Sequence, residues 1–302
     1  MGTSRGYSLR ASYAVANISE QAVLRYRKRL EKESSDLVGL LNAMDQYRDK
    51  HPGCGLEKMY YQLQVSCMGR DRFIKFAQEM GYSIKKFRLM TKTTLSGYYI
   101  WPDVIQGMLI CAINKVWQSD ITYFRVAEKF FYITFILDVY SRVIISYAVS
   151  RTLEAKANIE ALSKAISYRK GDHLKGLIHH SDRGSQYTSK KYLQMLSSNS
   201  MQPSMGYKGP DNAYAERVNG IIKNEYLIYR DIRTERDLRK WVRQAVGQYN
   251  EERIHNSLPG RQSPKQFEQE LVTLNYQKRP KVIIYTEGRP TMQPAQCRLH
   301  SL

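Results

Sequence analysis

Acidic residues are scarce in this chain, and its cysteines are few and scattered. The 302 residues include 28 Asp and Glu against 47 Lys and Arg, which gives a formal net charge of +19 at pH 7. The four cysteines form no CxxC pair, so neither a zinc knuckle nor a disulfide framework is indicated. No apolar run approaches the length of a membrane span, and the N-terminus has no apolar signal segment. The chain is therefore expected to be soluble and intracellular, with reduced thiols.

The basic excess indicates a polyanionic partner, for which nucleic acid is the usual candidate. The excess is spread along the chain rather than gathered in one tail, as suits a long polyanion that crosses a folded surface. A ribosomal-type protein or a membrane-surface protein is the alternative that charge alone leaves open. The apolar fraction of 42% is sufficient for real cores, and the length allows about two or three domains.

Residues 1–95 are predicted to form a helical region. Segments 18–34 and 36–53 carry apolar residues at helical spacing, and shorter helices follow, with a last, basic helix after Gly81. Short helices with tight breaks favour a DNA-reading helix-turn-helix, a pattern that many other small helical domains share. Residues 96–112 show no clear periodicity of apolar residues and are predicted to form a linker.

Residues 113–232 are predicted to form an α/β domain. Three consecutive segments rich in β-branched and aromatic residues predict an antiparallel meander, after which helices and short strands alternate. The resulting order, β-β-β-α-β-α-β-α, gives a mixed sheet flanked by helices, which is the order of the ribonuclease-H-like fold. Residues 233–302 are predicted to form a basic helical C-terminal extension, loose after about residue 271.

Three acids of this domain are candidate metal ligands. Asp120 lies inside an apolar strand, where a carboxylate is costly to bury unless it is paired or binds a metal. Asp182 ends a short core strand, and Glu216 lies on a later helix. A buried ion pair remains the alternative for Asp120, and a turn cap remains the alternative for Asp182.

The stretch GPDNAYAERVNGIIKNEY opens as a turn and continues as a helix. Asp211 or Asn212 is expected to cap this helix. At about 100° per residue, Lys223 lies within about 20° of Glu216 around the axis, whereas Glu225 lies about 180° away. Glu225 is therefore expected to have a solvent or packing role. Lys223 is expected to hold a DNA phosphate on the face of Glu216, with an ordinary exposed lysine as the alternative.

Carboxylates on two strands and a helix can converge on two Mg²⁺ ions, for which Mn²⁺ is an expected substitute. Hard divalent cations prefer carboxylate oxygens, and two of them can activate a water or a 3′-hydroxyl for in-line attack on phosphorus. His179 and His180 also invite a metal-ligand interpretation, but adjacent strand residues point to opposite faces. A satisfied structural role is the favoured interpretation for each histidine.

Five blocks of sequence resemble those of a known family, in the order WQSDITYF, LDVYSR, HHSDRGSQYTS, DNAYAERVNGIIKNEY and YNEERIHNSLPGRQSPKQF. Together they look like the transposases of bacterial insertion sequences in the IS-three family, whose core is similar to retroviral integrase. The resemblance spans about residues 45–270. The helical stretch before the core also resembles the helix-turn-helix of that family.

The resemblance implies a DDE recombinase, an enzyme named after two aspartates and one glutamate. These acids fall on Asp120, Asp182 and Glu216, and the basic residue that follows the glutamate in the family falls on Lys223. The interval between Asp182 and Glu216 is slightly shorter than is usual in the family, and the loop before the helix can absorb the difference. The residues expected to contact DNA are Lys223, Arg217, Lys208 and Arg183.

The activity that this resemblance implies is Mg²⁺-dependent cleavage at the ends of an insertion sequence, followed by strand transfer into target DNA. The expected partners are double-stranded DNA, with the terminal inverted repeats and the target, and further copies of the chain. The chain resembles the product of a second reading frame, so fusion with an upstream frame is also expected. Its expected location is the bacterial cytoplasm, at the nucleoid. The alternatives are a retired transposase acting as a repressor, a nuclease that does not join strands, and a structural RNA-binding protein.

Overall fold

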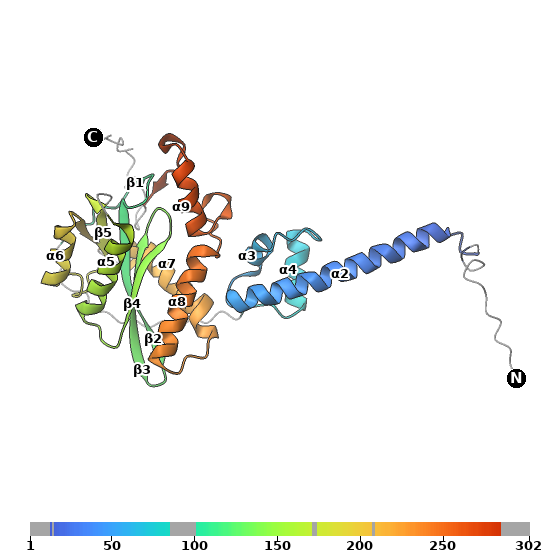
Figure 1. Cartoon of the computed structure of the whole chain (residues 1–302), viewed down its shortest axis with the longest axis horizontal. Helices are drawn as coiled ribbons and strands as arrows, with labels where there is room; N and C mark the ends of the chain where they lie inside the picture. Colours follow the sequence, from blue (N-terminus) through green and yellow to red (C-terminus); the bar gives the residue numbers. More distant parts are fainter. Residues whose placement is uncertain (1–12, 14, 85–100, 171–173, 207–208, 285–302) are drawn as a thin grey trace. The chain divides into compact units, whose positions relative to one another are not determined.

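The chain forms two compact units (Figure 1). The computed structural model describes residues 13, 15–84, 101–170, 174–206 and 209–284. One unit comprises Met1–Lys50 and Cys54–Lys85, and the other comprises His51–Gly53 and Lys86–Leu302. Within the described ranges, no helix combines the length and the apolar character needed to cross a bilayer.

The first unit is helical, as predicted. It contains α2 (Glu20–Lys50), α3 (Leu56–Gln62) and α4 (Arg70–Glu79). The buried side chains of Met44, Met59 and Phe73, one from each helix, meet in its core. α2 is a single helix of 31 residues, so the predicted division into 18–34 and 36–53 is wrong. The chain has two serines at that division, which cost a helix little, and it has neither proline nor glycine there.

The chain leaves α4 at Gly81, whose φ of +83° ends the helix in a conformation that favours glycine. The basic helix predicted after Gly81 and part of the linker predicted over 96–112 lie outside the described residues. The helical character of this unit is confirmed, whereas its role in reading DNA stays a prediction.

The second unit contains a five-stranded sheet in the order β4-β3-β2-β5-β6. Its strands are β2 (Val116–Val126), β3 (Lys129–Asp138), β4 (Ile144–Ser150), β5 (Ile178–Ser181) and β6 (Gln202–Met205). β2, β3 and β4 pair antiparallel, whereas β5 pairs parallel with β2 and with β6. The predicted meander, the mixed sheet and the ribonuclease-H-like order of elements are confirmed.

Helices cover both faces of this sheet (Figure 1). These helices are α5 (Ala155–Arg169) and α6 (Lys190–Ser198) on one face, and α7 (Ala213–Ile221) and α8 (Glu235–Glu251) on the other. Successive residues of a strand point to opposite faces of the sheet. Ile136 therefore packs with α5 and α6, whereas Phe135 packs with α7 and α8. α8 lies within the predicted extension 233–302, and its Leu238 and Val242 are fully buried in the core beside β3.

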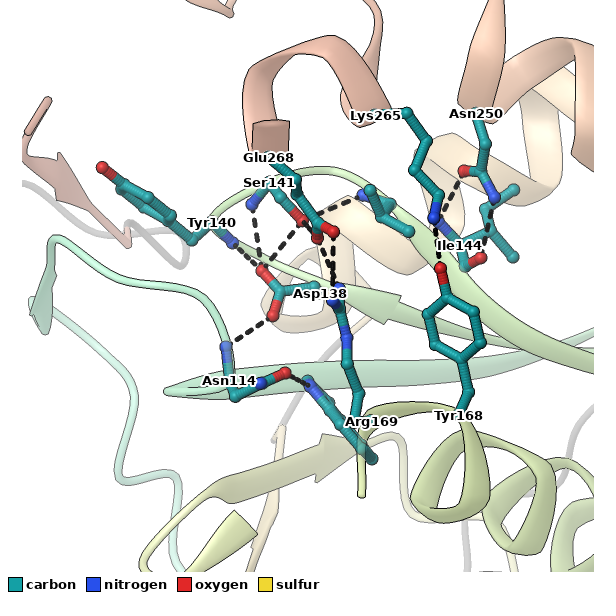
Figure 2. Close-up of polar contacts among 12 residues, drawn as sticks. Asn114, Asp138, Tyr140, Ser141, Ile144, Tyr168, Arg169, Asn250, Lys265 and Glu268 are labelled. Carbon is teal, nitrogen blue, oxygen red and sulfur yellow. Dashed lines mark hydrogen bonds and ion pairs between the residues drawn. The ribbon is translucent and has the colours of Figure 1, made fainter. Parts of the chain in front are cut away.

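A polar cluster ties α9 (Pro264–Thr273) to the turn between β3 and β4 and to α5 (Figure 2). The carboxylate of Asp138 accepts hydrogen bonds at 2.7–3.0 Å from three backbone N–H groups, those of Asn114, Tyr140 and Ser141. Glu268 of α9 accepts a hydrogen bond of 2.6 Å from the Ser141 hydroxyl and forms an ion pair with Arg169 of α5. We call this group the Asp138 cluster.

The chain after α9 also returns to the second unit. The short strand β7 (Val282–Ile283) pairs antiparallel with β1 (Leu109–Ile110). Ile284, directly after β7, is fully buried in a core that also contains Phe267 of α9. The prediction of a loose extension after about residue 271 is therefore wrong as far as Ile284, and the residues beyond it lie outside the described part of the chain.

Candidate active site

Asp120 lies in β2, and Asp182 comes directly after the neighbouring parallel strand β5. The register pairs Ser119 of β2 with Ser181 of β5, so each aspartate is the next residue after a paired serine. β5 ends at Ser181, whereas β2 continues to Val126 and, among the described strands, is paired there with β3 alone. The two acids therefore lie where the sheet loses β5 and β6 and narrows from five strands to three, β4, β3 and β2.

α7 is fixed against β2 by polar contacts on either side of the turn that carries the predicted glutamate. Gln118 of β2 caps the helix, because its Oε1 accepts hydrogen bonds of 3.2 Å from the backbone N–H groups of Tyr214 and Ala215. One turn later, the buried Asn219 donates from Nδ2 to Oδ2 of Asp120 at 2.7 Å. These contacts hold the helix turn between them close to Asp120.

The prediction that Asp211 or Asn212 caps this helix with its side chain is wrong. Asn212 occupies the N-cap position but makes no capping hydrogen bond, and its Nδ2 donates instead to the carbonyl oxygen of Ser119 at 2.8 Å. Asp211 is buried, and its charge acts on His180. The cap is supplied by the strand because Gln118 already accepts from the first free amides of the helix.

The predicted acids are close enough for the charge of Asp182 to act on both Asp120 and Glu216. Loss of surrounding water raises the pKa of Asp120 well above its usual range, and the negative charges of Asp182 and Glu216 raise it further. Glu216 is exposed on α7, yet partial desolvation of its carboxyl and the charge of Asp182 raise its pKa as well. Burial raises the pKa of Asp182, against the effect of the Gly184 N–H that donates to its Oδ1 at 3.0 Å. Negative charge is therefore disfavoured here, and a cation would stabilise the site.

The donor set suits a hard divalent cation, although no closed cage is present. Among the residues that the structure describes, no three His, Cys, Asp or Glu side chains stand close enough together to hold an ion. Asp120, Asp182 and Glu216 nevertheless offer the oxygen ligands that Mg²⁺ prefers, and a divalent charge would relieve their mutual repulsion. The oxygen ligands and the negative charge of the site therefore suit Mg²⁺, and binding of the ion requires the three carboxylates to move closer together.

Lys223 does not share a continuous α-helix with Glu216. α7 ends at Ile221 and a π-helical turn, Ile222–Tyr226, follows, in which each N–H bonds five residues back. The angle of about 20° predicted from α-helical geometry is therefore wrong, because a π-helical turn rotates less per residue. Lys223 is half-buried, which lowers its pKa, and its Nζ lies 4.5 Å from the centroid of the Tyr123 ring.

Of the other residues predicted to contact DNA, the structure describes Arg183 and Arg217, which directly follow Asp182 and Glu216 in the chain. Arg183 is half-buried, and its Nε donates to the carbonyl oxygen of Gly206 at 3.1 Å. Arg217 is exposed on α7, and its charge acts on Tyr249 of α8. Lys208 lies outside the described residues. Contact of these three side chains with DNA stays a prediction.

The adjacent histidines point to opposite sides of β5 and have structural partners, as predicted. Nε2 of His179 lies 3.0 Å from the hydroxyl of Tyr192 in α6. Nδ1 of His180 lies 2.9 Å from the hydroxyl of Ser204 in β6. Burial lowers the pKa of His179 to about 3 and that of His180 to about 4. Both rings are therefore neutral at physiological pH.

Glu225 also has a partner in the protein, which confirms its predicted packing role. Both carboxylate oxygens accept hydrogen bonds of 2.8 Å from the guanidinium of Arg253, whose side chain is 2% exposed. A planar guanidinium and a carboxylate that meet through two bonds form a geometrically specific pair. This pair fixes the π-helical turn to the end of α8 and keeps Glu225 out of the acid site.

Gln118 and Asn219 were missed by the sequence analysis. Gln118 is two residues before Asp120 and therefore shares its face of β2, and Asn219 is one helical turn after Glu216. These spacings place each amide beside a candidate acid, and they are the signal that could have identified both residues. Their partners lie on other elements, so spacing alone could not have told which atoms they bind.

The segment that contains the three acids is similar to known proteins. Residues 112–210 and 200–264 each match a family described as "Integrase core domain". The Shigella sonnei protein "Insertion element IS600 uncharacterized 31 kDa protein" is 32% identical over 206 residues, covering 66% of this chain and 75% of that protein. The Mycobacterium tuberculosis "Putative transposase for insertion sequence element IS986/IS6110" is 39% identical over 121 residues, covering 38% of this chain and 44% of that protein. The Escherichia coli "Transposase InsF for insertion sequence IS3A" is 34% identical over 163 residues, covering 51% of this chain and 54% of that protein.

The matches extend over the whole acid site. This chain spans about half the length of the mycobacterial and Escherichia coli relatives and three quarters of the Shigella protein. The first integrase-core match includes Asp120 and Asp182, and the second includes Glu216. The chain belongs to the insertion-sequence transposases with an integrase core domain.

Proposed function

We propose that the chain is a DDE transposase that cuts DNA at the ends of an insertion sequence and joins those ends to target DNA. The observation that carries the proposal is that Asp120 and Asp182 directly follow paired residues of β2 and β5, where the charges of Asp182 and Glu216 act on Asp120. Carboxylates that disfavour one another's charge are a cost to the fold, which a bound divalent cation offsets. Membership of the integrase-core transposases supports the same reaction.

Two Mg²⁺ ions are the proposed cofactor, and Mn²⁺ is the proposed substitute. When bound, the ions would activate the attacking oxygen and neutralise the charge that develops on the leaving oxygen. Asp120, Asp182 and Glu216 would supply the protein ligands. Asn219 orients Asp120 through its 2.7 Å hydrogen bond, and the Gly184 N–H does the same for Asp182.

The proposed reaction has two phosphoryl-transfer steps. In the first, a water oxygen bonds to phosphorus while the P–O3′ bond breaks, which leaves a 3′-hydroxyl on the element end. In the second, this 3′-hydroxyl loses its proton and attacks a phosphodiester of the target, and the target's own 3′-oxygen leaves. The second step replaces one phosphodiester by another, so it needs no outside energy source, and positioning and charge neutralisation suffice.

The proposed partners follow from charge and family. Double-stranded DNA, as terminal inverted repeat and as target, suits a formal net charge of +19. The DNA contacts proposed are those of Lys223, Arg217, Lys208 and Arg183. Assembly with further copies of the chain, fusion with an upstream frame and a location at the bacterial nucleoid in the cytoplasm belong to the same proposal.

A cleavage and joining assay tests this function. The substrates are labelled duplexes that carry the inverted repeats found beside the gene, incubated with the full chain and Mg²⁺. Asp120→Asn, Asp182→Asn and Glu216→Gln should each lose cleavage and joining while DNA binding is retained. The matched control is Glu160→Gln, which neutralises an exposed carboxylate paired with Lys164 on α5 and should leave both reactions intact. A near wild-type rate in any of the three variants removes that residue from the site.

A retired transposase that only binds DNA is the second candidate. The specific observation in its favour is that no closed group of three metal ligands stands in the described part of the chain. On this alternative, the wild type binds the element ends but yields no product with Mg²⁺ or with Mn²⁺. Cleaved product without joined product would instead indicate a nuclease of the same fold.

A further inference from the structure

The β2–β3 ribbon beyond the acids carries an exposed aromatic ring. β2 is paired with β5 as far as Ser119 and with β3 as far as Val126, so the tip of the hairpin extends past the rest of the sheet. On this tip, the side chain of Phe130 is 51% exposed. Its ring meets the ring of Tyr123 edge to face, with the centroids 5.6 Å apart and the planes at 76°. Tyr123 therefore supports the orientation of the exposed ring.

A lysine reaches the same pair of rings from the helix side. α7 packs on the face of β2 that carries Asp120, whereas Tyr123 is three residues further and points to the other face. Lys223 comes from the turn after α7, yet its Nζ lies 4.5 Å from the Tyr123 ring centroid, within cation–π range. Its side chain therefore crosses the edge of β2 that β5 has left. A carboxylate, an ammonium group and the Tyr123 ring therefore follow one another along this edge, and the Phe130 ring lies beyond Tyr123 on β3.

We propose that Phe130 is a stacking platform for an unpaired DNA base near the cleaved end, with Lys223 on the adjoining phosphate. The proposal rests on the proposed function, because that function brings an opened DNA end to Asp120. Every base has a π-face, so stacking on a phenylalanine tolerates any sequence. Phe130 lies opposite Arg125, and the five residues from Asp120 to Arg125 span about 17 Å of strand, or about five nucleotide steps of one DNA strand.

The charges around the ring favour nucleic acid as its occupant. The tip of the hairpin, residues 121–132, contains a single acid, Glu128, and that acid forms an ion pair of 2.5 Å with Arg125. Arg125 lies opposite Phe130 in the register and is exposed, and Lys223 adds a further positive charge. An aromatic ring between cations matches a base that is flanked by phosphates.

The test is a binding experiment without divalent metal, performed on the full chain in the presence of EDTA. The probe is a duplex with 2-aminopurine as an unpaired terminal base, and its partner is a blunt duplex with the same base paired. Wild type should quench the unpaired probe by stacking on it. Phe130→Leu should abolish the quenching and weaken binding of this probe by about 5- to 100-fold, the effect of one lost base stack. Binding of the blunt duplex should change less, and Phe130→Tyr, which keeps the ring, should behave as wild type.

Two results would overturn the platform. One is equal quenching by wild type and Phe130→Leu, and the other is loss of quenching only together with an altered sedimentation coefficient of the free variant, which would assign Phe130 to a protein contact. Phe130→Met, which also lacks the ring, repeats the test if thermal unfolding shows that Phe130→Leu is misfolded. Val272→Ala on α9 is the matched control, because it shortens another exposed apolar side chain. Asp120→Asn should still quench, so failure of the platform and failure of the proposed catalysis are distinguishable.

Discussion

Two aspartates of the same sheet, Asp138 and Asp120, have opposite environments. Asp138 accepts hydrogen bonds from three backbone N–H groups and, at 3.2 Å, from the Ser141 hydroxyl (Figure 2). Asp120 accepts one side-chain hydrogen bond, from Asn219, and faces the negative charges of Asp182 and Glu216. Burial raises the pKa of both carboxyls, but the charge of Arg169 and the backbone donors oppose this rise at Asp138, whereas the neighbouring acids add to it at Asp120. Burial therefore does not distinguish the two acids. The groups around the carboxylate do: an acid surrounded by donors stabilises the fold, whereas an acid beside other acids is available to bind a metal.

The largest expected effect comes from neutralising the acid with few donors. Asp120→Asn should lower the rate of cleavage by about a thousandfold or more, because an amide is a poor ligand for a hard cation. The temperature of unfolding should stay the same or rise, since the repulsion by Asp182 and Glu216 is removed. Single-turnover cleavage rates and thermal unfolding measure the two quantities. A strong destabilisation of the Asp120→Asn variant would contradict the distinction between Asp120 and Asp138, because Asp120 would then stabilise the fold as well.

The second prediction applies the same substitution to the acid with many donors. Asp138→Asn should lower the free energy of unfolding by about 2–4 kcal/mol, because the new amide group points N–H bonds at backbone N–H donors. Ser141→Ala removes one of the donors and should cost about 1 kcal/mol. Urea unfolding at pH 7.5 measures both, and cleavage per folded molecule should remain near wild type. An unaltered stability of Asp138→Asn would show that the number of donors does not mark a structural acid.

The third prediction concerns the one side chain that donates to Asp120. Asn219→Ala removes the 2.7 Å hydrogen bond and should lower activity by about 10- to 100-fold, the usual effect of losing a group that orients a metal ligand. The Mg²⁺ concentration that gives half-maximal activity should rise as well. Gln244→Ala, which removes an exposed amide on α8, is the matched control. A lower stability with an unaltered Mg²⁺ requirement would assign Asn219 to the fold alone.

The sequence predicts what depends on local pattern. The β-branched and aromatic residues of β2 were sufficient to predict a strand, the segment that forms α8 was predicted to be a basic helix, and the acid in an apolar strand was sufficient to single out Asp120. The cap of α7 could not be predicted, because its acceptor on Gln118 comes from a strand 96 residues earlier. The continuous α-helix assumed as far as Lys223 was wrong, since a π-helical turn begins at Ile222, and this turn includes Glu225, which forms a long-range ion pair with Arg253. Contacts between distant segments leave no periodic signal in either partner.

The smallest expected effect belongs to a buried titratable group that lies near the acids but not among them. His179 is neutral because burial lowers its pKa to about 3, from about 6.5 in the unfolded chain. Below pH 6.5 the unfolded chain therefore binds one proton more than the folded chain, and stability declines as the pH falls toward 3. His179→Gln should remove this contribution, so that the loss of unfolding free energy between pH 6.5 and pH 5.5 is smaller than in wild type by about 1 kcal/mol. Urea unfolding at the two pH values measures the difference, in which other titrating groups largely cancel. Equal slopes would show that the bond to Tyr192, rather than the absence of charge, is what His179 contributes to this side of the sheet.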